Sequence, residues 1–450
     1  MKTMKLGYLA VSKASWMTPK IAAIAAETER NLRTLDAEVL FHGVTTTETE
    51  ARERAREFTL AGVDAVILHL VTFPVGATIP AAAQELEVPI LLLANPEQPG
   101  PGAMWEQNSF CGANMAAHGL NRLRKSYSYT FALPGETAAK LAVPLAAVRA
   151  RKKMRELRIG QVGGRVPGFY TSNFDELQLR RELGVAVEIL DLLELVKTAE
   201  TLSGTELETA RKVVSSNAAR VNAVSEKELE LAAKLYGSFR KTAEKYNLST
   251  YAVRCWPEWS DLFGIAPCAV LGMLSNTGLV SSCEGDVNGA VTMKLLEFLA
   301  GGGIPFFVDL ISYDEQENTG VIWHCGAAPA GLCRDFSETQ LRLHMRVDGG
   351  DKKGITNDFP LKAGRITIAK LDTDADGKTR MLIVPATALD TAPFLRGNPL
   401  RIRFDGKVPE LIDTIIKKGF EHHYAVIHAD VKAELLQFCE WLKIETVTVD

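Results

Sequence analysis

Paired cysteines and long apolar runs are both missing from this 450-residue chain. Its seven cysteines are odd in number and include no Cys-x-x-Cys pair, which disfavours a secreted disulfide framework and a structural zinc site. We expect reduced and mostly buried thiols at Cys111, Cys255, Cys268, Cys283, Cys325, Cys333 and Cys439. No stretch approaches the roughly 18 apolar residues of a membrane span, and no apolar leader follows Met1. The sequence therefore predicts a cytoplasmic protein that does not enter a membrane.

A concentrated block of basic residues is also missing. The chain carries 51 Lys and Arg residues against 55 Asp and Glu residues, a formal net charge of −4, and the basic residues are dispersed along it. A protein that binds nucleic acid needs a basic surface to neutralise the phosphate backbone. We therefore expect no nucleic-acid partner.

The pattern of apolar residues predicts two α/β domains followed by a β-rich domain. In residues 1–150, strand-like apolar runs alternate with amphipathic segments, and the same alternation restarts in residues 151–303. Repeated strand–helix units of this kind build doubly wound parallel sheets. In residues 304–450 consecutive strands adjoin, and the DADG sequence at 374–377 indicates a hairpin turn. This last region is therefore expected to be largely antiparallel.

Four potential metal ligands lie far apart in the chain, each within a short and unusual local sequence. They are Glu284 in SCEGDVNGA, Asp309 in FFVDLISYD, His324 in VIWHCG and His423 in EHHYAVIHAD. An acid at the end of an apolar strand is costly to bury unless it is paired or binds a cation. Carboxylates and imidazoles together can hold one divalent cation and leave positions open for a substrate. The sequence therefore predicts a metal-dependent enzyme.

Several of these residues also have a purely structural interpretation. A lone histidine on a strand, such as His324, is often a core residue with its hydrogen bonds satisfied. Asp286, close to Glu284, fits the N-cap of the helix that follows it. His422 and His423 are adjacent, so on a strand their side chains would point to opposite faces, and only one would reach a given site.

Three further segments are candidate ligand contacts. The glycine-rich run at 160–168 does not match Gly-x-Gly-x-x-Gly, which favours a turn or a sugar-binding loop over a dinucleotide site. Trp256 and Trp259 are expected either to line a pocket or to pack in the core. Asn114 and His118 lie in a polar segment, which indicates either a surface held against a partner or a helix face exposed to solvent.

Taken together, these segments resemble those of the L-fucose isomerase and L-arabinose isomerase superfamily. The similarity is most specific over residues 281–430, where CEGDVNGA, VIWHCG and HHYAVIHAD look like the fucose isomerase-type C-terminal region. The resemblance implies two flavodoxin-like or Rossmann-like α/β domains followed by a β-rich domain. It also implies interconversion of an aldose and a ketose with Mn²⁺, for which Mg²⁺ or Co²⁺ are plausible substitutes.

The resemblance also implies roles for individual residues. Glu284, Asp309 and His423 would bind the metal, and His324 would bind either the metal or a sugar hydroxyl. Glu284 and Asp309 would also carry the proton between C1 and C2 of the sugar through an enediol(ate), as base and acid. 

The resemblance further implies a homo-oligomer, a trimer or hexamer, whose active site is completed by a neighbouring subunit. Asn114 and His118 would then be substrate contacts contributed across the interface.

The expected substrate is a free sugar such as fucose or arabinose, and three alternatives remain. One is a C6-modified hexose such as sulfoquinovose, for which Arg254, Trp256 and Trp259 would line the pocket. Another is a non-catalytic sugar-binding protein of the periplasmic type, which the clustered acids disfavour. The third is a nucleotide-dependent oxidoreductase that uses the glycine-rich run.

Overall fold

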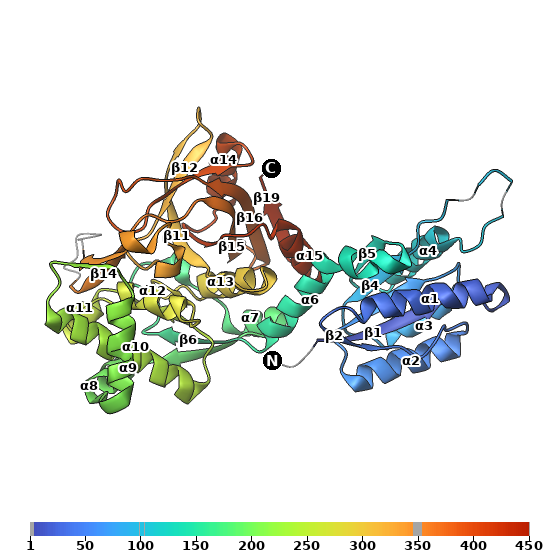
Figure 1. The fold of residues 1–450 in the computed structure, drawn as a ribbon, viewed down its shortest axis with the longest axis horizontal. Coiled ribbons are helices and arrows are strands. Elements are labelled where there is room, and N and C mark those ends of the chain that lie inside the picture. Colours follow the sequence, from blue (N-terminus) through green and yellow to red (C-terminus); the bar gives the residue numbers. More distant parts are fainter. Residues whose placement is uncertain (1–3, 99, 103, 345–352, 450) are drawn as a thin grey trace. The chain divides into compact units, whose positions relative to one another are not determined.

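The computed structural model describes residues 4–98, 100–102, 104–344 and 353–449. The chain divides into two compact units. The first comprises Met1–Lys152 and Leu436–Lys443, and the second comprises Lys153–Leu435 and Ile444–Asp450. In Figure 1 the N-terminal part of the first unit runs from blue to cyan, its Leu436–Lys443 segment is dark red, and most of the second unit runs from green to red. The expected division into three domains stays a prediction.

The first unit contains a parallel sheet in the order β2-β1-β3-β4-β5. Its strands are β1 (Met4–Val11), β2 (Ala37–Leu40), β3 (Ala65–Leu70), β4 (Ile90–Ala94) and β5 (Tyr127–Phe131). The helices of this part of the chain are η1 (Ala14–Trp16), α1 (Pro19–Leu32), α2 (Glu48–Ala61), α3 (Thr78–Gln84), α4 (Ser109–Arg122), η2 (Pro134–Glu136), α5 (Thr137–Lys140) and α6 (Ala142–Arg155). Apolar residues of α2, α3 and α4 pack with those of β1, β3 and β4 into one core.

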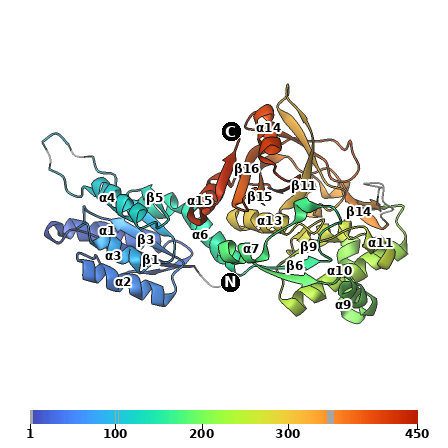
Figure 2. The same cartoon turned by 180° about the vertical axis from the view of Figure 1, so that it is seen from behind.

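The second unit begins with another parallel sheet, in the order β10-β9-β6-β7. Its strands are β6 (Arg158–Val162), β7 (Ala186–Leu190), β9 (Thr250–Val253) and β10 (Ser281–Ser282). The helices here are η3 (Tyr170–Ser172), α7 (Glu176–Leu183), α8 (Leu192–Thr201), α9 (Gly204–Ser216), α10 (Glu226–Tyr246), α11 (Glu258–Leu262), α12 (Cys268–Asn276) and α13 (Val287–Leu299). Helices α9 and α10 lie side by side (Figure 2). The predicted strand–helix alternation is therefore present in both parts of the chain.

The C-terminal part of the second unit is rich in β-structure. A seven-stranded sheet has the order β15-β18-β11-β12-β17-β16-β19, and β15 also pairs with β16, so the strands from β15 to β16 close into a ring. The strands are β11 (Phe306–Asp314), β12 (Thr319–Trp323), β15 (Gly364–Thr373), β16 (Thr379–Ala388), β17 (Leu400–Phe404), β18 (His423–Ile427) and β19 (Glu445–Thr448). All pairings are antiparallel except that of β16 with β19. The predicted hairpin turn at 374–377 joins β15 to β16, as expected.

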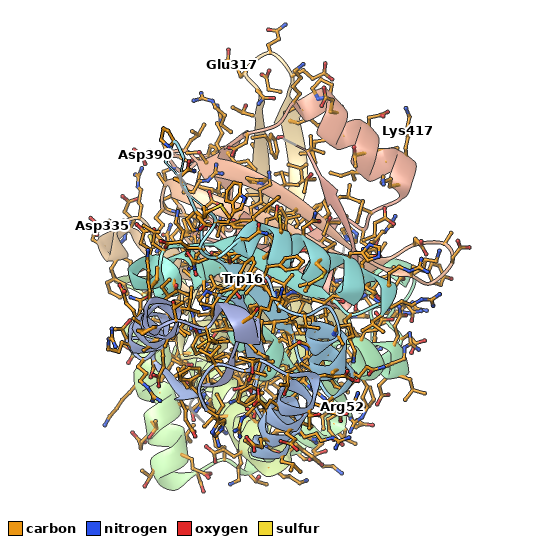
Figure 3. All side chains as sticks on the ribbon, turned by 90° about the vertical axis from the view of Figure 1, so that its right-hand side faces the viewer. Trp16, Arg52, Glu317, Asp335, Asp390 and Lys417 are labelled. Carbon is orange, nitrogen blue, oxygen red and sulfur yellow. The ribbon has the colours of Figure 1, made fainter. Side chains whose placement is uncertain are left out.

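A smaller sheet and several short helices complete this region. The sheet has the order β14-β13-β8, with β8 (Arg220–Asn222), β13 (Gln340–Leu343) and β14 (Ile355–Asp358). The helices are η4 (Ala330–Leu332), η5 (Phe336–Glu338) and α14 (Val408–Lys418). Helix α15 (Lys432–Leu442) begins in the second unit, and its residues from Leu436 onward belong to the first. Charged side chains such as Glu317 and Lys417 project outward from the second unit (Figure 3).

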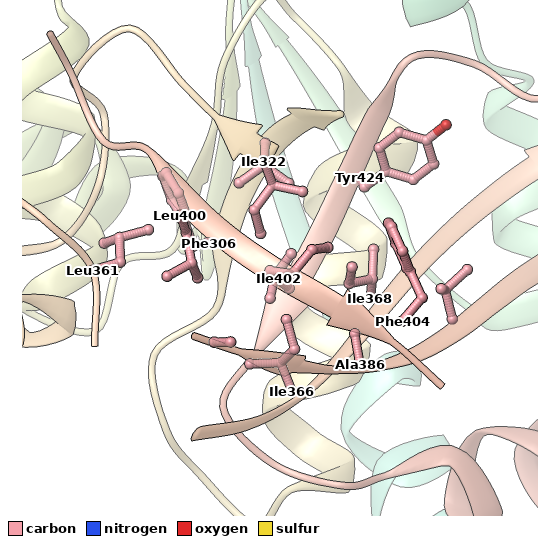
Figure 4. Close-up of a cluster of buried hydrophobic side chains, with 14 of the residues drawn as sticks. Phe306, Ile322, Leu361, Ile366, Ile368, Ala386, Leu400, Ile402, Phe404 and Tyr424 are labelled. Carbon is pink, nitrogen blue, oxygen red and sulfur yellow. The ribbon is translucent and has the colours of Figure 1, made fainter. Parts of the chain in front are cut away.

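The ring of strands encloses an apolar core. Ile366, Ile368, Ile402 and Phe404 are among the side chains that pack together in it (Figure 4). Helix α13 is buried along almost its whole length, because it packs against β9 of the parallel sheet and against β15 and β18 of the ring. The four-stranded parallel sheet and the ring of strands therefore meet across α13, and the acids at the start of this helix lie between them.

None of the helices within the described residues combines the length and the apolar character that crossing a bilayer requires.

Shortening a core side chain tests the packing of the ring. Ile402 is fully buried on β17, so Ile402→Ala should lower the free energy of unfolding by about 2–5 kcal/mol, through lost apolar contacts and a residual cavity. Ile416 on α14 is 73% exposed, and Ile416→Ala should change it by less than about 0.5 kcal/mol. Urea denaturation followed by tryptophan fluorescence measures both. Equal losses for the two variants would contradict this account of the core.

Candidate active site

The turn between β10 and α13 holds two acidic side chains in an unusual backbone conformation. Glu284 and Gly285 have φ angles of 60° and 72°, in the left-handed region that favours glycine. A side chain at Gly285 would come within 2.2 Å of the carbonyl oxygen of Gly164, so glycine is required there. Asp286 accepts a hydrogen bond from the Gly289 amide at 2.6 Å and caps α13. The N-cap interpretation of Asp286 is therefore confirmed.

His423, the first residue of β18, joins the acids of this turn. Its Nε2 lies 2.7 Å from Glu284 Oε2, and its Nδ1 lies 3.1 Å from Asp286 Oδ2. Asp309 on β11 is the register partner of His423, and its Oδ1 lies 3.9 Å from His423 Nε2. One fully buried imidazole thus meets carboxylates from the α13 turn and from the neighbouring strand.

A buried lysine extends this cluster on the other side of Asp286. Lys370 on β15 is fully buried, and its Nζ lies 2.8 Å from Asp286 Oδ2 and also contacts the Glu421 carboxylate. A buried ammonium is stable only when it is paired, so Lys370 balances part of the acidic charge. The sequence analysis missed this residue, although a lysine inside the apolar strand ITIAKL was a usable signal.

The pKa values follow from these contacts. Burial alone would raise the pKa of Glu284, but the hydrogen bond and positive charge of His423 lower it to about 2. Burial alone would lower the pKa of His423, but its bonds to Asp286 and Glu284 raise it to about 9. Burial raises the pKa of Glu421 to about 8, and the charge of Lys370 offsets only part of that effect. In the protein without a bound ion, Glu284 is therefore ionised and His423 carries a proton at neutral pH.

His422 also reaches the cluster, which the sequence analysis did not expect. Its side chain precedes β18, so the alternation of side chains along a strand does not apply to it. Ligand atoms of Glu284, His422 and His423 all lie within 4.8 Å of one another. The prediction that only one of the two histidines reaches the site was therefore wrong.

The three residues predicted to line a substrate pocket in the second unit differ in their distance from the acids and in their burial. Trp256 donates from Nε1 to Glu284 Oε1 at 3.2 Å, so it lies directly beside the site. Arg254 pairs through Nη2 with Glu258 Oε1 at 2.9 Å, and its buried Nε has no hydrogen-bond acceptor among the described residues. Trp259 is fully buried and donates to the Arg254 carbonyl, so its core interpretation is confirmed.

His324 follows β12 and is buried. Its ring lies 5.6 Å from that of Phe307, the same ring that lies 4.7 Å from His423. Its Nδ1 lies 3.7 Å from the sulfur of Cys325. Among the described residues, the compact ligand group consists of Glu284, His422 and His423, and neither His324 nor Asp309 is part of it. The role of His324 stays a prediction, and Asp309 is linked to the group by its 3.9 Å distance to His423 Nε2.

Asn114 and His118 belong to the first unit. They are exposed on α4, one turn apart, and therefore share one face of that helix. Their expected contact with a site in a neighbouring subunit stays a prediction.

The donor set of the cluster fits a divalent cation. Glu284 and Asp309 supply carboxylate oxygens on the Nε2 side of His423, and His422 adds a second imidazole. Asp309 Oδ1 is buried and accepts no hydrogen bond from the described residues. Buried polar atoms in native proteins normally have a partner, and a bound cation would supply one here. Asp286 holds the other nitrogen of His423, as carboxylates do for metal-binding histidines.

Comparison with known proteins relates the chain to sugar isomerases. A family model described as "Fucose/sulfoquinovose isomerase, N-terminal domain" matches residues 7–150. A sulfoquinovose isomerase of Alkalicoccus urumqiensis is 31% identical over 394 residues, which cover 86% of this chain and 86% of that protein. Sulfoquinovose isomerases of Priestia aryabhattai and of Clostridium sp. (strain MSTE9) are 30% and 29% identical and cover 85% and 84% of this chain, and 85% of each of those proteins.

Likeness to solved structures is weak. A periplasmic solute-binding protein from Actinobacillus succinogenes with bound D-allose is 10% identical, with a TM-score of 0.19, and covers 67% of this chain and 93% of that protein. That value carries no argument about fold or function. The alignments with the relatives named above cover about 85% of both chains, and about 30% of the aligned residues are identical. The chain therefore belongs to the fucose isomerase-like superfamily and is an aldose–ketose sugar isomerase.

Proposed function

We propose that the protein is a metal-dependent isomerase that converts sulfoquinovose, a hexose with a sulfonate at C6, into its ketose. The relatives named above are sulfoquinovose isomerases that match both units of the chain. They favour this substrate over fucose or arabinose, which the sequence analysis put first. The observation that carries the proposed chemistry is the convergence of Glu284, Asp309 and His423 at one buried point.

We assign the cation to Glu284, Asp309 and His423, with His422 within reach as a further ligand. Oxygen donors with one or two imidazoles suit Mn²⁺, with Mg²⁺ or Co²⁺ as possible substitutes. When bound, the cation stabilises negative charge on the sugar oxygens at C1 and C2, which makes the C2 proton more acidic.

The carboxylates of the chain carry the proton. Conversion of an aldose to a ketose through an enediol(ate) removes the proton from C2 and returns a proton to C1. Both oxygens of Glu284 already accept hydrogen bonds, from Trp256 and His423. Asp309 Oδ1 accepts none from the described residues, so we assign this atom to take the proton from C2. Glu284 then fixes the sugar hydroxyls or assists the return of the proton.

The sulfonate requires a cationic contact on the protein. Arg254 lies two residues before Trp256, which touches Glu284. Its Nε is buried without an acceptor among the described residues, so we assign Arg254 as the contact to the sulfonate. His324 in this unit, and Asn114 and His118 from a neighbouring copy in a homo-oligomer, are the further substrate contacts we propose.

A comparison of substrates tests the proposed specificity. The holoenzyme should form a ketose from sulfoquinovose with a kcat/KM about 10²-fold or more above that for fucose or arabinose, because a substrate without a sulfonate leaves the buried Nε of Arg254 without an acceptor among the described residues. Chromatographic assay of ketose formation measures all three. Similar or higher values for fucose would sink the substrate assignment and leave the isomerase assignment intact.

Replacement of the central carboxylate tests the catalytic assignment. Glu284→Gln keeps the size of the side chain but removes its charge, and kcat should fall about 10²- to 10⁴-fold. Circular dichroism should show an unchanged fold. Glu317→Gln, at an exposed glutamate in the turn between β11 and β12, is the matched control and should keep full activity. A fully active Glu284→Gln enzyme would remove this residue from the mechanism.

Replacement of the acid behind His423 tests its positioning role. Asn caps helices as well as Asp does, so Asp286→Asn should preserve α13 while weakening the hold on His423 Nδ1. The affinity for Mn²⁺ should fall about 10- to 100-fold. Isothermal titration of the metal-free protein with Mn²⁺ measures this directly. An unchanged affinity would show that Asp286 only caps the helix.

A further inference from the structure

Three ligand-type side chains from distant parts of the sequence meet at a second place in the second unit. Cys268 begins α12, Cys325 follows β12, and His344 follows β13. The sulfurs of Cys268 and Cys325 lie 3.9 Å apart, and His344 Nε2 lies 3.2 Å from the sulfur of Cys268. All three ligand atoms lie within 4.8 Å of one another. The proposed isomerase function uses none of them.

The spacing fits a tetrahedral metal site. A zinc ion with bonds of about 2.3 Å to sulfur places two thiolates about 3.8 Å apart. The separation between Cys268 and Cys325 is close to that value and far longer than the roughly 2.05 Å of a disulfide bond. A ring nitrogen of His344 lies within 4.8 Å of both sulfurs, as a third ligand must.

Two further thiols surround Cys268. Cys255 and Cys283 are both buried and both hydrogen-bond with it. Cys268 is the first residue of α12, where the N-terminus of the helix favours a thiolate over a thiol. A fully buried thiolate is costly unless a cation compensates its charge.

A catalytic cysteine–histidine pair is the other arrangement that this geometry resembles. Cys268 is fully buried, however, and Cys325 is 4% exposed. A sugar-sized substrate cannot reach such sulfurs, whereas a bare ion can be enclosed as the chain folds. The burial therefore favours a metal ligand over a nucleophile.

We propose that Cys268, Cys325 and His344 bind a second divalent cation of the zinc class. The ion links α12, the end of β12 and the end of β13, so its function is structural. Its sulfur donors select a softer metal than the carboxylates of the isomerase site do. The sequence analysis disfavoured a structural zinc site because the chain has no Cys-x-x-Cys pair. That pattern detects only ligands that lie close together in the sequence, and these three ligands do not.

Metal analysis and cobalt spectroscopy of the full-length protein test the proposal. Protein produced with added zinc should contain about one zinc ion per chain, in addition to any ion of the isomerase site. Metal-free, reduced protein titrated with Co²⁺ should develop the near-ultraviolet charge-transfer band of thiolate bound to cobalt. The band should be lost in the double variant Cys268→Ser with Cys325→Ser, and weakened in His344→Ala, which changes only a half-buried side chain.

Matched variants separate this site from the rest of the protein. Cys439→Ser, at a buried thiol outside the cluster, and Cys111→Ser, at an exposed one, should keep the band and the zinc. Glu284→Gln should keep both as well, so the result is independent of the isomerase assignment.

Three outcomes would overturn the proposal. The first is no band in the wild-type protein at saturating Co²⁺, and the second is a band that survives in the double variant. The third is a Cys268–Cys325 disulfide, or rapid alkylation of Cys268 by iodoacetamide, in the zinc-treated native protein. A disulfide would indicate a redox pair, and rapid alkylation would indicate an accessible nucleophile.

Discussion

The placement of His423 between two carboxylates is the interaction on which the site depends. Glu284 and Asp286 lie almost completely out of water, and isolated buried carboxylates are costly. His423 and Lys370 compensate them, one from β18 and the other from β15. The ring of strands thus supplies the cations that compensate the acids of the α13 turn.

This charge arrangement also explains how the site would bind an ion and still move a proton in the proposed function. The Asp286 carboxylate already contacts His423, Lys370 and the Gly289 amide at the start of α13. It is therefore suited to orienting these groups and not to proton transfer. Asp309 is the opposite case, since its Oδ1 is buried and lacks a hydrogen bond from the described residues. The two acids differ because of their positions. Asp286 is the N-cap of α13, where backbone amides are at hand, and Asp309 lies within strand β11.

Much of the fold could be predicted from the sequence, because strand–helix alternation and the turn at 374–377 are local signals. Glu284 and Asp286 could also be predicted from the sequence, because acids after an apolar strand are unusual and Asp is a common N-cap residue. The contacts of Lys370 with Asp286 and of Cys268 with Cys325 could not be predicted, because strand pairing and helix packing bring these residues together. His422 was misjudged because β18 begins one residue later than the alternation argument assumed. The proposed substrate came from the relatives and not from any motif.

Diffraction from crystals grown with Mn²⁺, with anomalous data collected at the manganese absorption edge, tests the central claim most directly. We expect one strong manganese peak about 2.0–2.5 Å from carboxylate oxygens of Glu284 and Asp309 and from Nε2 of His423, with Nδ1 of that histidine still bonded to Asp286. A peak elsewhere in the molecule would contradict the account. So would well-ordered density in which Glu284 and His423 keep their direct contact and hold no ion at saturating Mn²⁺.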